Sequence, residues 1–147
     1  MSATIDFTTV TNSIAALTVS GVTLKDADEI TASRLAQAAV LSPRPEDFIT
    51  DFSVTPDEIS KQKFTIRYTL NYVYFHCQIG SQLDFPVYAA MLTKIAAILV
   101  AMINNNTISG ALDTEAPKIS NFGSVVDPAG NAYFGCVISL DIMQFLN

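Results

Sequence analysis

The only histidine of this sequence, His76, is the residue best suited to acid-base chemistry. Paired with a carboxylate such as Asp141 or Asp84, an imidazole can act as a general base near neutral pH. No other residues form a pattern typical of a nucleophile, an oxyanion hole or a metal site. The sequence therefore favours a strand histidine that is hydrogen-bonded to a neighbouring group. It predicts no catalytic residue and no enzymatic activity.

Two further groups of residues have the types, but not the spacing, of metal ligands. Asp26, Asp28 and Glu29 lack the longer acidic loop and its glycine that bind calcium, so we interpret them as a solvated turn. Cys77 and Cys136 lie far apart in strand-like runs, and we interpret them as buried, reduced thiols. We therefore expect neither a metal nor a cofactor.

Low charge is the main feature of the composition. Of the 147 residues, 50% are hydrophobic and 15% are charged, against about 25% charged in an average protein. A single domain over residues 1–147 is long enough to bury a core of its own. So small a number of charged groups suggests that part of the surface is shared with other chains.

The charge distribution and the N-terminus limit the expected partners and location. The net charge is -6 and there is no cluster of Lys or Arg, so we expect no specific binding of nucleic acid through its phosphates. The first residues lack the basic start and short apolar core of a secretory signal. The chain is therefore expected to stay in the cytoplasm in which it is made.

The segment from Asp84 to Asn106 predicts one long helix with almost no charged face. One side is expected to pack on a sheet, and the other is expected to be buried either against another subunit or within the same chain. A membrane span is disfavoured because Pro86 and Lys94 interrupt the apolar run. The large residues are Tyr88, Met91, Leu92, Ile95, Ile98, Leu99 and Met102, and the small side comprises Ala90, Thr93, Lys94, Ala97 and Ala101.

The remaining segments predict one further helix and several strands. Residues 7–18 have helical spacing, and residues 30–54 predict loops with short strands. In residues 64–79 alternate residues from Phe64 to Tyr74 share one apolar face, and residues 118–146 predict a hairpin around the turn DPAGN. The predicted fold class is α+β, a mainly antiparallel β-sheet packed by one long apolar helix, with an N-terminal helix and a C-terminal β-hairpin.

In the order of its segments the chain resembles the tail terminator, or tail-completion, proteins of long-tailed bacteriophages. The resemblance rests on the N-terminal helix, the segment SPRPED, the long strand KFTIRYTLNYVYF, the apolar helix FPVYAAMLTKIAAILVAMINN and the final hairpin. It implies a protein of the virion tail, assembled in the host cytoplasm, that forms a ring of about six copies. Such a ring caps the tail tube, joins it to the head connector and has no catalytic residues.

Ring closure requires two different patches that meet between neighbouring subunits. The small side of the long helix and the polar end of the long strand are the candidates for these patches. An acidic lumen would let DNA pass, because like charges repel phosphates. The predicted interface residues are Arg67, Thr69, Asn71, Ala90, Lys94, Ala97 and Ala101, and the predicted lumen residues are Glu46, Asp47, Asp51, Asp57 and Glu58.

Two alternatives are open at this point. Among structural proteins, a tail-tube subunit or a head-tail connector stopper has a similar size and a similar mixture of helices and strands. From another class, a small-molecule enzyme or binding protein of the cone-shaped or hot-dog type would wrap a curved sheet around a long helix. His76 with Asp141, facing a cavity lined by Tyr72, Tyr74 and Phe134, would then form the active pair.

Overall fold

The computed structural model of the chain describes residues 7–19, 22–24, 39–44, 47–56, 63–79, 85–104, 113–114, 117–126, 130 and 132–146. These residues form two helices and one sheet of seven strands. The helices are α1 (Phe7–Ala15) and α2 (Phe85–Asn104). The strands are β1 (Thr23–Leu24), β2 (Val40–Pro43), β3 (Ile49–Pro56), β4 (Phe64–Gln78), β5 (Asp113–Thr114), β6 (Lys118–Val126) and β7 (Ala132–Leu146).

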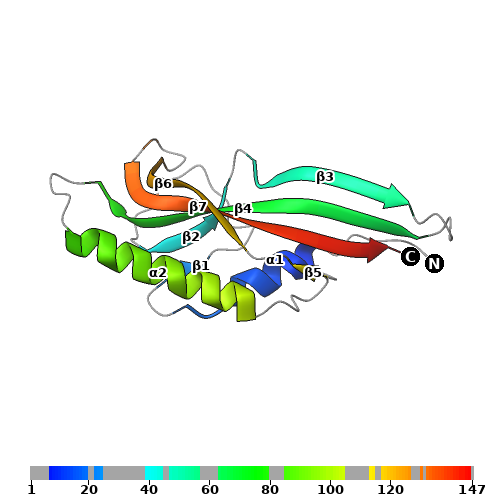
Figure 1. Cartoon of the computed structure of the whole chain (residues 1–147), viewed down its shortest axis with the longest axis horizontal. Coiled ribbons are helices and arrows are strands. Elements are labelled where there is room, and N and C mark those ends of the chain that lie inside the picture. Colours follow the sequence, from blue (N-terminus) through cyan, green and yellow to red (C-terminus); the bar gives the residue numbers. More distant parts are fainter. Residues whose placement is uncertain are drawn as a thin grey trace.

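Two long antiparallel strands, β4 and β7, form the centre of the sheet (Figure 1). Their register runs from Phe64 opposite Leu146 to Gln78 opposite Tyr133. β2 and β3 pair with different ends of the other edge of β4, and β1 runs parallel to β2. β6 and β5 pair with the other edge of β7. Shorter strands therefore widen the central pair on both sides.

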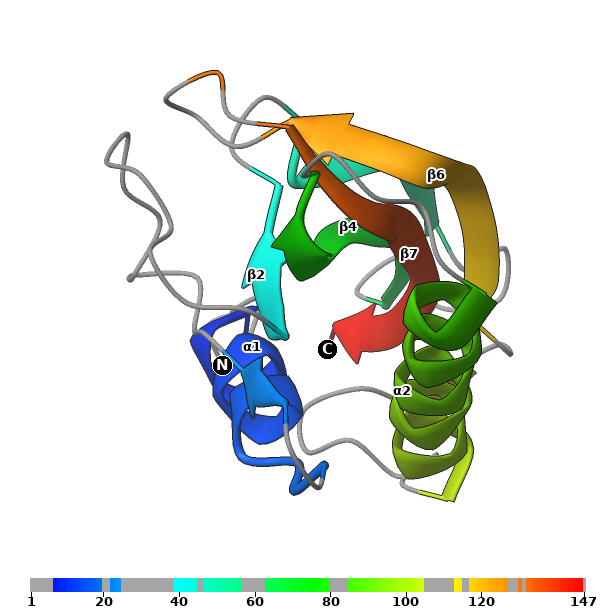
Figure 2. The same ribbon diagram turned by 90° about the vertical axis from the view of Figure 1, so that its left-hand side faces the viewer.

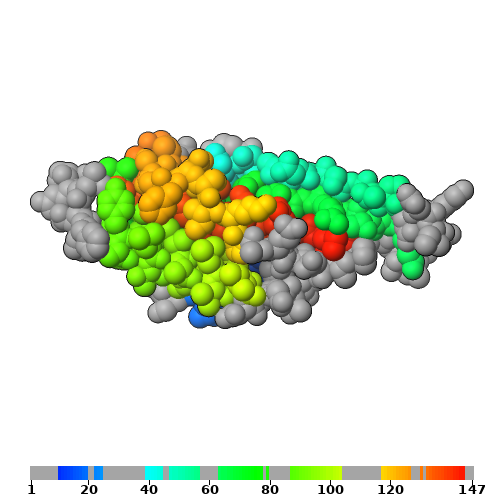
Figure 3. Space-filling model, viewed as in Figure 1, coloured from blue at the N-terminus to red at the C-terminus, as the bar shows by residue number. Residues whose placement is uncertain are grey.

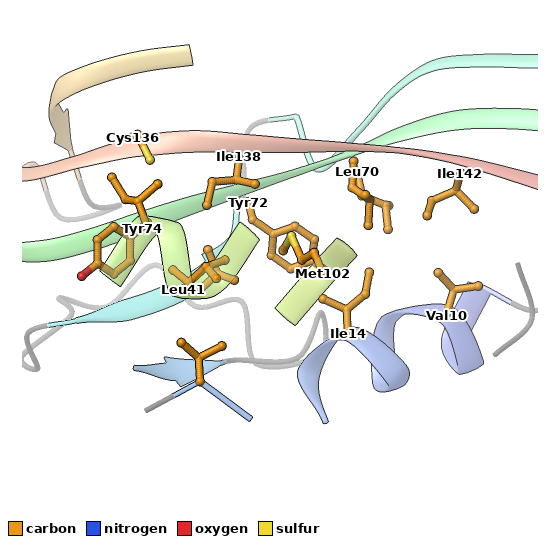
Figure 4. Close-up of a cluster of buried hydrophobic side chains, with 14 of the residues drawn as sticks. Val10, Ile14, Leu41, Leu70, Tyr72, Tyr74, Met102, Cys136, Ile138 and Ile142 are labelled. Carbon is orange, nitrogen blue, oxygen red and sulfur yellow. The ribbon is translucent and has the colours of Figure 1, made fainter. Parts of the chain in front are cut away.

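The sheet is strongly curved, and both helices lie on its concave side, which we call the inner face (Figure 2). On this face alternate residues of β4 and β7 pack with the helices into one core, as the period of two predicts. Figure 4 shows Val10 and Ile14 rising from α1 toward the sheet. The largest fully buried side chains include Leu41, Leu70, Tyr72, Tyr74, Met91, Ile98, Met102, Ile138, Leu140 and Ile142.

A smaller apolar cluster covers one end of the opposite, outer face. Val73 and Phe75 of β4 belong to it, with Val125 of β6 and with Tyr133 and Val137 of β7. The rings of Phe75 and Tyr133 meet edge to face with centroids 5.2 Å apart. This cluster explains why the outward residues of β4 change from polar to apolar along the strand, since only this end is covered on both faces.

The predicted fold class is corrected by this arrangement. The structure is mostly β-sheet, the sheet is mixed because β1 and β2 are parallel, and the helices supply a minor part of the core. A helix does form at residues 85–104, but it exposes Leu92, Val100 and Ile103 and is not the apolar packing helix of the prediction. The cause is that β1, β2, β3, β5 and β6 widen the central pair into one mixed sheet, in which β4 and β7 supply most of the buried apolar side chains. Within the described ranges, no helix has the length and apolarity needed to cross a membrane.

Three predicted elements are present, namely the long strand as β4, the N-terminal helix and the C-terminal hairpin, and several predicted residues lie outside the described structure. The N-terminal helix forms as α1 and ends at Ala15, and the C-terminal hairpin forms as the antiparallel pair of β6 and β7. The residues that lie outside the described ranges are Asp26, Asp28, Glu29 and Asp84, together with the predicted lumen residues Glu46, Asp57 and Glu58.

Candidate functional site

Large apolar side chains are exposed in three groups, each on one element. Single exposed apolar residues are normal on a monomer, whereas groups of them mark surfaces that bind other molecules. The side chains in these groups are 39% to 57% exposed. We name them the β3 strip (Ile49, Phe52, Val54), the β6 strip (Ile119, Phe122, Val126) and the α2 patch (Leu92, Val100, Ile103).

The β3 strip lies on an edge strand whose alternation is shifted by a bulge. The register of β3 with β4 slips at Asp51, which adopts a left-handed conformation with a φ of 54°. A bulge adds a residue and changes which side chains share a face. Ile49, Phe52 and Val54 therefore all lie on the inner face, where Phe52 stacks on Tyr68 with ring centroids 6.3 Å apart. Without the bulge, simple alternation would place Phe52 and Val54 on the opposite face from Ile49.

The β6 strip lies on the edge strand at the other side of the sheet and has a bulge of its own. Its register with β7 shifts at Asn121, whose φ is 51°. Ile119 lies opposite the buried Ile138, and Val126 lies opposite Ala132, so both side chains are on the inner face. None of the described strands pairs with the second edge of β3 or of β6. Both edges present backbone groups together with apolar side chains.

The α2 patch is the exposed side of the long helix, and α2 lies beside β6 on one face of the molecule (Figure 3). Leu92, which the helical spacing assigns to the buried side, is 54% exposed, so that assignment is wrong. Among the predicted interface residues, Ala97 and Ala101 pack against the core, Lys94 is half-buried and Ala90 is exposed. The exposed side of α2 therefore carries Leu92, Val100 and Ile103, and it differs from the side of small residues that the sequence predicts to face away from the sheet.

A polar hollow of about 280 Å³ opens where β3, β4 and β7 meet. It brings together two predicted interface residues, Arg67 and Thr69, and one predicted lumen residue, Asp51. Thr69 Oγ1 donates a 2.6 Å hydrogen bond to Oδ1 of Asp141, and Lys118 Nζ lies 3.4 Å from the other oxygen of that carboxylate. The lining residues are Asp51, Ser53, Arg67, Tyr68, Thr69, Asp141, Ile142 and Met143.

The two described residues of the predicted lumen share their surroundings with arginines. Asp47 Oδ1 lies 3.1 Å from Arg44 Nε, and Asp51 lines the hollow with Arg67. The partly exposed pair of Arg44 and Asp47 contributes little to stability, because water and salt screen it. The described part of the predicted acidic lining is therefore a surface of mixed charge.

Asn71, the third predicted interface residue of β4, is 7% exposed and makes its contacts within the fold. Its Nδ2 donates hydrogen bonds to the Asp47 carbonyl oxygen at 2.9 Å and to Thr50 Oγ1 at 3.0 Å. Its Oδ1 accepts a hydrogen bond from Ser139 Oγ at 2.7 Å. One amide thus connects β4 with β7, with β3 and with the residues that lead into β3.

No protein-family model matches this chain. No curated protein is detectably similar to it either. The function of the chain is therefore inferred from its own geometry, in which the two free sheet edges with apolar side chains are the most unusual feature.

His76 and Asp141, the active pair of the alternative pocket protein, are not brought together. Asp141 lies opposite Thr69 in the register of β4 with β7, which is roughly 20 Å along the strand from His76. His76 Nδ1 instead lies within hydrogen-bond distance, 2.7 Å, of the hydroxyl oxygen of Tyr74. This contact matches the predicted strand histidine that is satisfied by a neighbouring group.

The two cysteines are free thiols that are kept protonated by burial. Burial raises the pKa of Cys136 to about 12 and also raises the pKa of Cys77, which is half-buried. A thiol in this state is a poor nucleophile. Across the described ranges, no three or more His, Cys, Asp or Glu side chains are grouped so as to hold a metal ion.

Replacing Lys94 by Met is expected to raise the pKa of His76. Burial lowers this pKa below its usual value of 6.5, and the positive charge of Lys94 lowers it further. Methionine removes the charge and keeps a side chain of similar length, so the effect of burial is retained. NMR titration of the imidazole protons measures the shift, with Lys118→Met as the control. Equal shifts in both variants, or none in Lys94→Met, would contradict the prediction.

The lowered pKa of His76 also makes the folded state less stable in acid. The unfolded chain binds a proton at a higher pH than the folded chain does, so stability is lost as the pH falls below about 6.5 toward the folded pKa. Lys94→Met raises the pKa of His76 in the folded state and therefore narrows the pH range over which this stability is lost.

The residues of the β3 and β6 strips are candidate functional residues that sequence reasoning missed. A signal was present, because Asp51 and Asn121 are residue types that tolerate the left-handed conformation of a bulge. That signal does not show which strands lie at an edge. Exposure of Phe52 or Ile119 depends on strand partners that are distant in the sequence.

Proposed function

We propose that this chain is a structural subunit that closes into a ring of about six copies and acts as a tail terminator of a long-tailed bacteriophage. The observation that carries the proposal is the pair of free sheet edges, each with exposed apolar residues, on different parts of the molecule. The resemblance in segment order adds the location. The ring caps the tail tube and joins it to the head connector.

Two unlike surfaces support a ring in preference to a dimer. A contact between unlike patches leaves one patch of each kind free, so copies add until the ring closes. A symmetrical dimer uses the same patch twice and leaves the other strip exposed. The low proportion of charged residues, 15%, agrees with a chain whose surface is partly covered in an assembly.

The α2 patch is available for a partner other than the neighbouring copy. In the proposed virion this partner is the tail-tube protein or the head-tail connector protein. The net charge of -6 suits a ring through which DNA passes, because like charges repel phosphates. Specific nucleic-acid binding is not part of the proposal.

The mass of the purified protein tests the proposal. Light scattering over a concentration series is expected to show a species of about six subunits, and negative-stain images of that species are expected to show rings. A tight dimer at every concentration would instead support the alternative pocket protein. A protein that is monomeric at every concentration would contradict self-assembly through the strips.

Replacing Phe52 by Glu is expected to break the ring into monomers. A carboxylate placed in an apolar contact loses hydration without gaining a partner, and a loss of about 2 kcal/mol weakens each contact about 30-fold. Val100→Glu is the matched control, because Val100 is similarly exposed, at 55% against 53%, but belongs to the α2 patch. Its rings are expected to persist. Loss of rings in both variants, or in neither, would contradict the role of the β3 strip.

A further inference from the structure

β3 and β6 are free edges of similar length. β3 has eight residues and β6 has nine, and each is paired along one side only within the described structure. Unpaired backbone groups on such an edge form a template for another strand. Within one copy β3 and β6 run in opposite directions, because β3 is antiparallel to β4, β4 to β7 and β7 to β6. Copies placed side by side in the same orientation therefore bring β3 and β6 together as an antiparallel pair.

The apolar faces of the two strands match. Ile49 and Val54 of β3 lie opposite buried inner-face residues of β4, and Ile119 of β6 lies opposite a buried inner-face residue of β7. In a sheet that continues from β3 into β6 of the next copy, these side chains all fall on the inner face. There they form cross-strand apolar contacts that each strip lacks on its own.

Each of the two edge strands carries one charged residue, and both charged residues lie on the outer face. Asp51 lines the polar hollow, and the exposed Lys118 lies on the same face, where its Nζ is 3.4 Å from Asp141 Oδ2. An antiparallel pairing of β3 with β6 places both side chains on the outer side of the junction but near its opposite ends, because each residue lies near the start of its strand. No like charges face each other across this junction.

We infer that β3 of one copy pairs with β6 of a second copy, so that the sheet continues across the subunit boundary. This inference rests on the proposed ring and names the two surfaces that meet in it. β3 and β6 flank opposite ends of the β4–β7 pair, so the junction is staggered along the strands (Figure 1). A closed barrel requires such a stagger, and closure removes the free edges.

Mixing two variants tests which edges meet. Phe52→Glu disables the β3 edge and Ile119→Glu disables the β6 edge, so each variant alone is expected to be a monomer. An equal mixture contains one intact combination, β3 of the Ile119→Glu chain with β6 of the Phe52→Glu chain. Light scattering of the mixture is expected to show twice the monomer mass and nothing larger, because the remaining edges of each pair are disabled.

Each other outcome overturns the inference. Variants that dimerise alone would show that like edges pair. A monomeric mixture, with a wild type that forms rings, would overturn the strand pairing but not the ring, and a wild type that never assembles would overturn both. Circular dichroism checks that each variant folds. Should either fail to fold, Val54→Glu and Val126→Glu alter the same two strips at exposed positions, 48% and 57%, and replace them.

Discussion

Replacing Gly135 by Ala is expected to lower the free energy of unfolding by about 3 kcal/mol, at the upper end of the usual cost of overpacking. A Cβ at this position would overlap the carbonyl oxygen of Tyr74 and lie 3.0 Å from Cγ2 of Val125. The oxygen belongs to the backbone of β4, so no rotation of a side chain relieves the overlap. The central strands must separate locally to admit the methyl group.

A bulge in β4 accounts for this close approach. Phe75 lies opposite Gly135 and Cys77 lies opposite Phe134, so His76 is an additional residue without its own partner on β7. Such an extra residue bends the bulged strand and increases its twist. The bend brings the backbone of β4 toward β7 and leaves no space for a side chain at residue 135.

Chemical unfolding at low protein concentration measures the effect of Gly135→Ala without a contribution from assembly. Gly130→Ala is the matched control, because a Cβ there meets nothing within 4 Å and only its φ of 90° is strained. That strain costs about 1 kcal/mol. An equal decrease in the free energy of unfolding in the two variants would show that the overlap is relieved at little energetic cost. The explanation by overlap would then be wrong.

The long periodic segments were predictable from the sequence. Leu70 and Tyr72 of β4 are buried as expected, because a period of two over a long strand leaves one way to bury the apolar side. The position of α2 also followed from helical spacing. The rotation of α2 about its own axis could not be predicted in this way, because so broad an apolar stripe is compatible with several rotations. Leu92 was therefore placed on the wrong side.

The bulges were not predictable. Asp51 and Asn121 adopt left-handed conformations, yet most Asp and Asn residues in proteins do not. Each bulge changes the alternation beyond it, so Phe52 shares a face with Ile49 although simple alternation separates them. The parallel pairing of β1 with β2 likewise depends on contacts between distant residues. These features, with the added edge strands, caused the error in fold class.

The candidate site was predictable only in its polar part. Arg67, Thr69 and Asp51 stood out as polar residues, and they share one hollow. Phe52 did not stand out as an exposed residue, because an aromatic residue in a strand indicates a core position until its neighbours are known. For Asn71 the error is the opposite one. A polar residue in a strand suggests an exposed position, but the side-chain amide of Asn71 is buried and makes three hydrogen bonds within the fold.

Replacing Asn71 by Ala is expected to lower the free energy of unfolding by about 3 kcal/mol and to leave the ring intact. The change removes three hydrogen bonds, to the Asp47 carbonyl oxygen, Thr50 Oγ1 and Ser139 Oγ. Each is worth about 1 kcal/mol, and the partners that stay buried gain no water in exchange. Denaturant unfolding measures the stability, and light scattering measures the mass of the assembly.

A double-mutant cycle with Ser139→Ala separates this role from a role in the interface. Ser139→Ala alone loses one hydrogen bond, about 1 kcal/mol, and in the Asn71→Ala background it is expected to cost almost nothing, because its partner is already absent. An interface residue would behave differently, with an unchanged monomer stability and a smaller assembly. A loss of stability with retained rings would mean that Asn71 acts from inside, by holding β3 against β4 so that its free edge can meet the next copy.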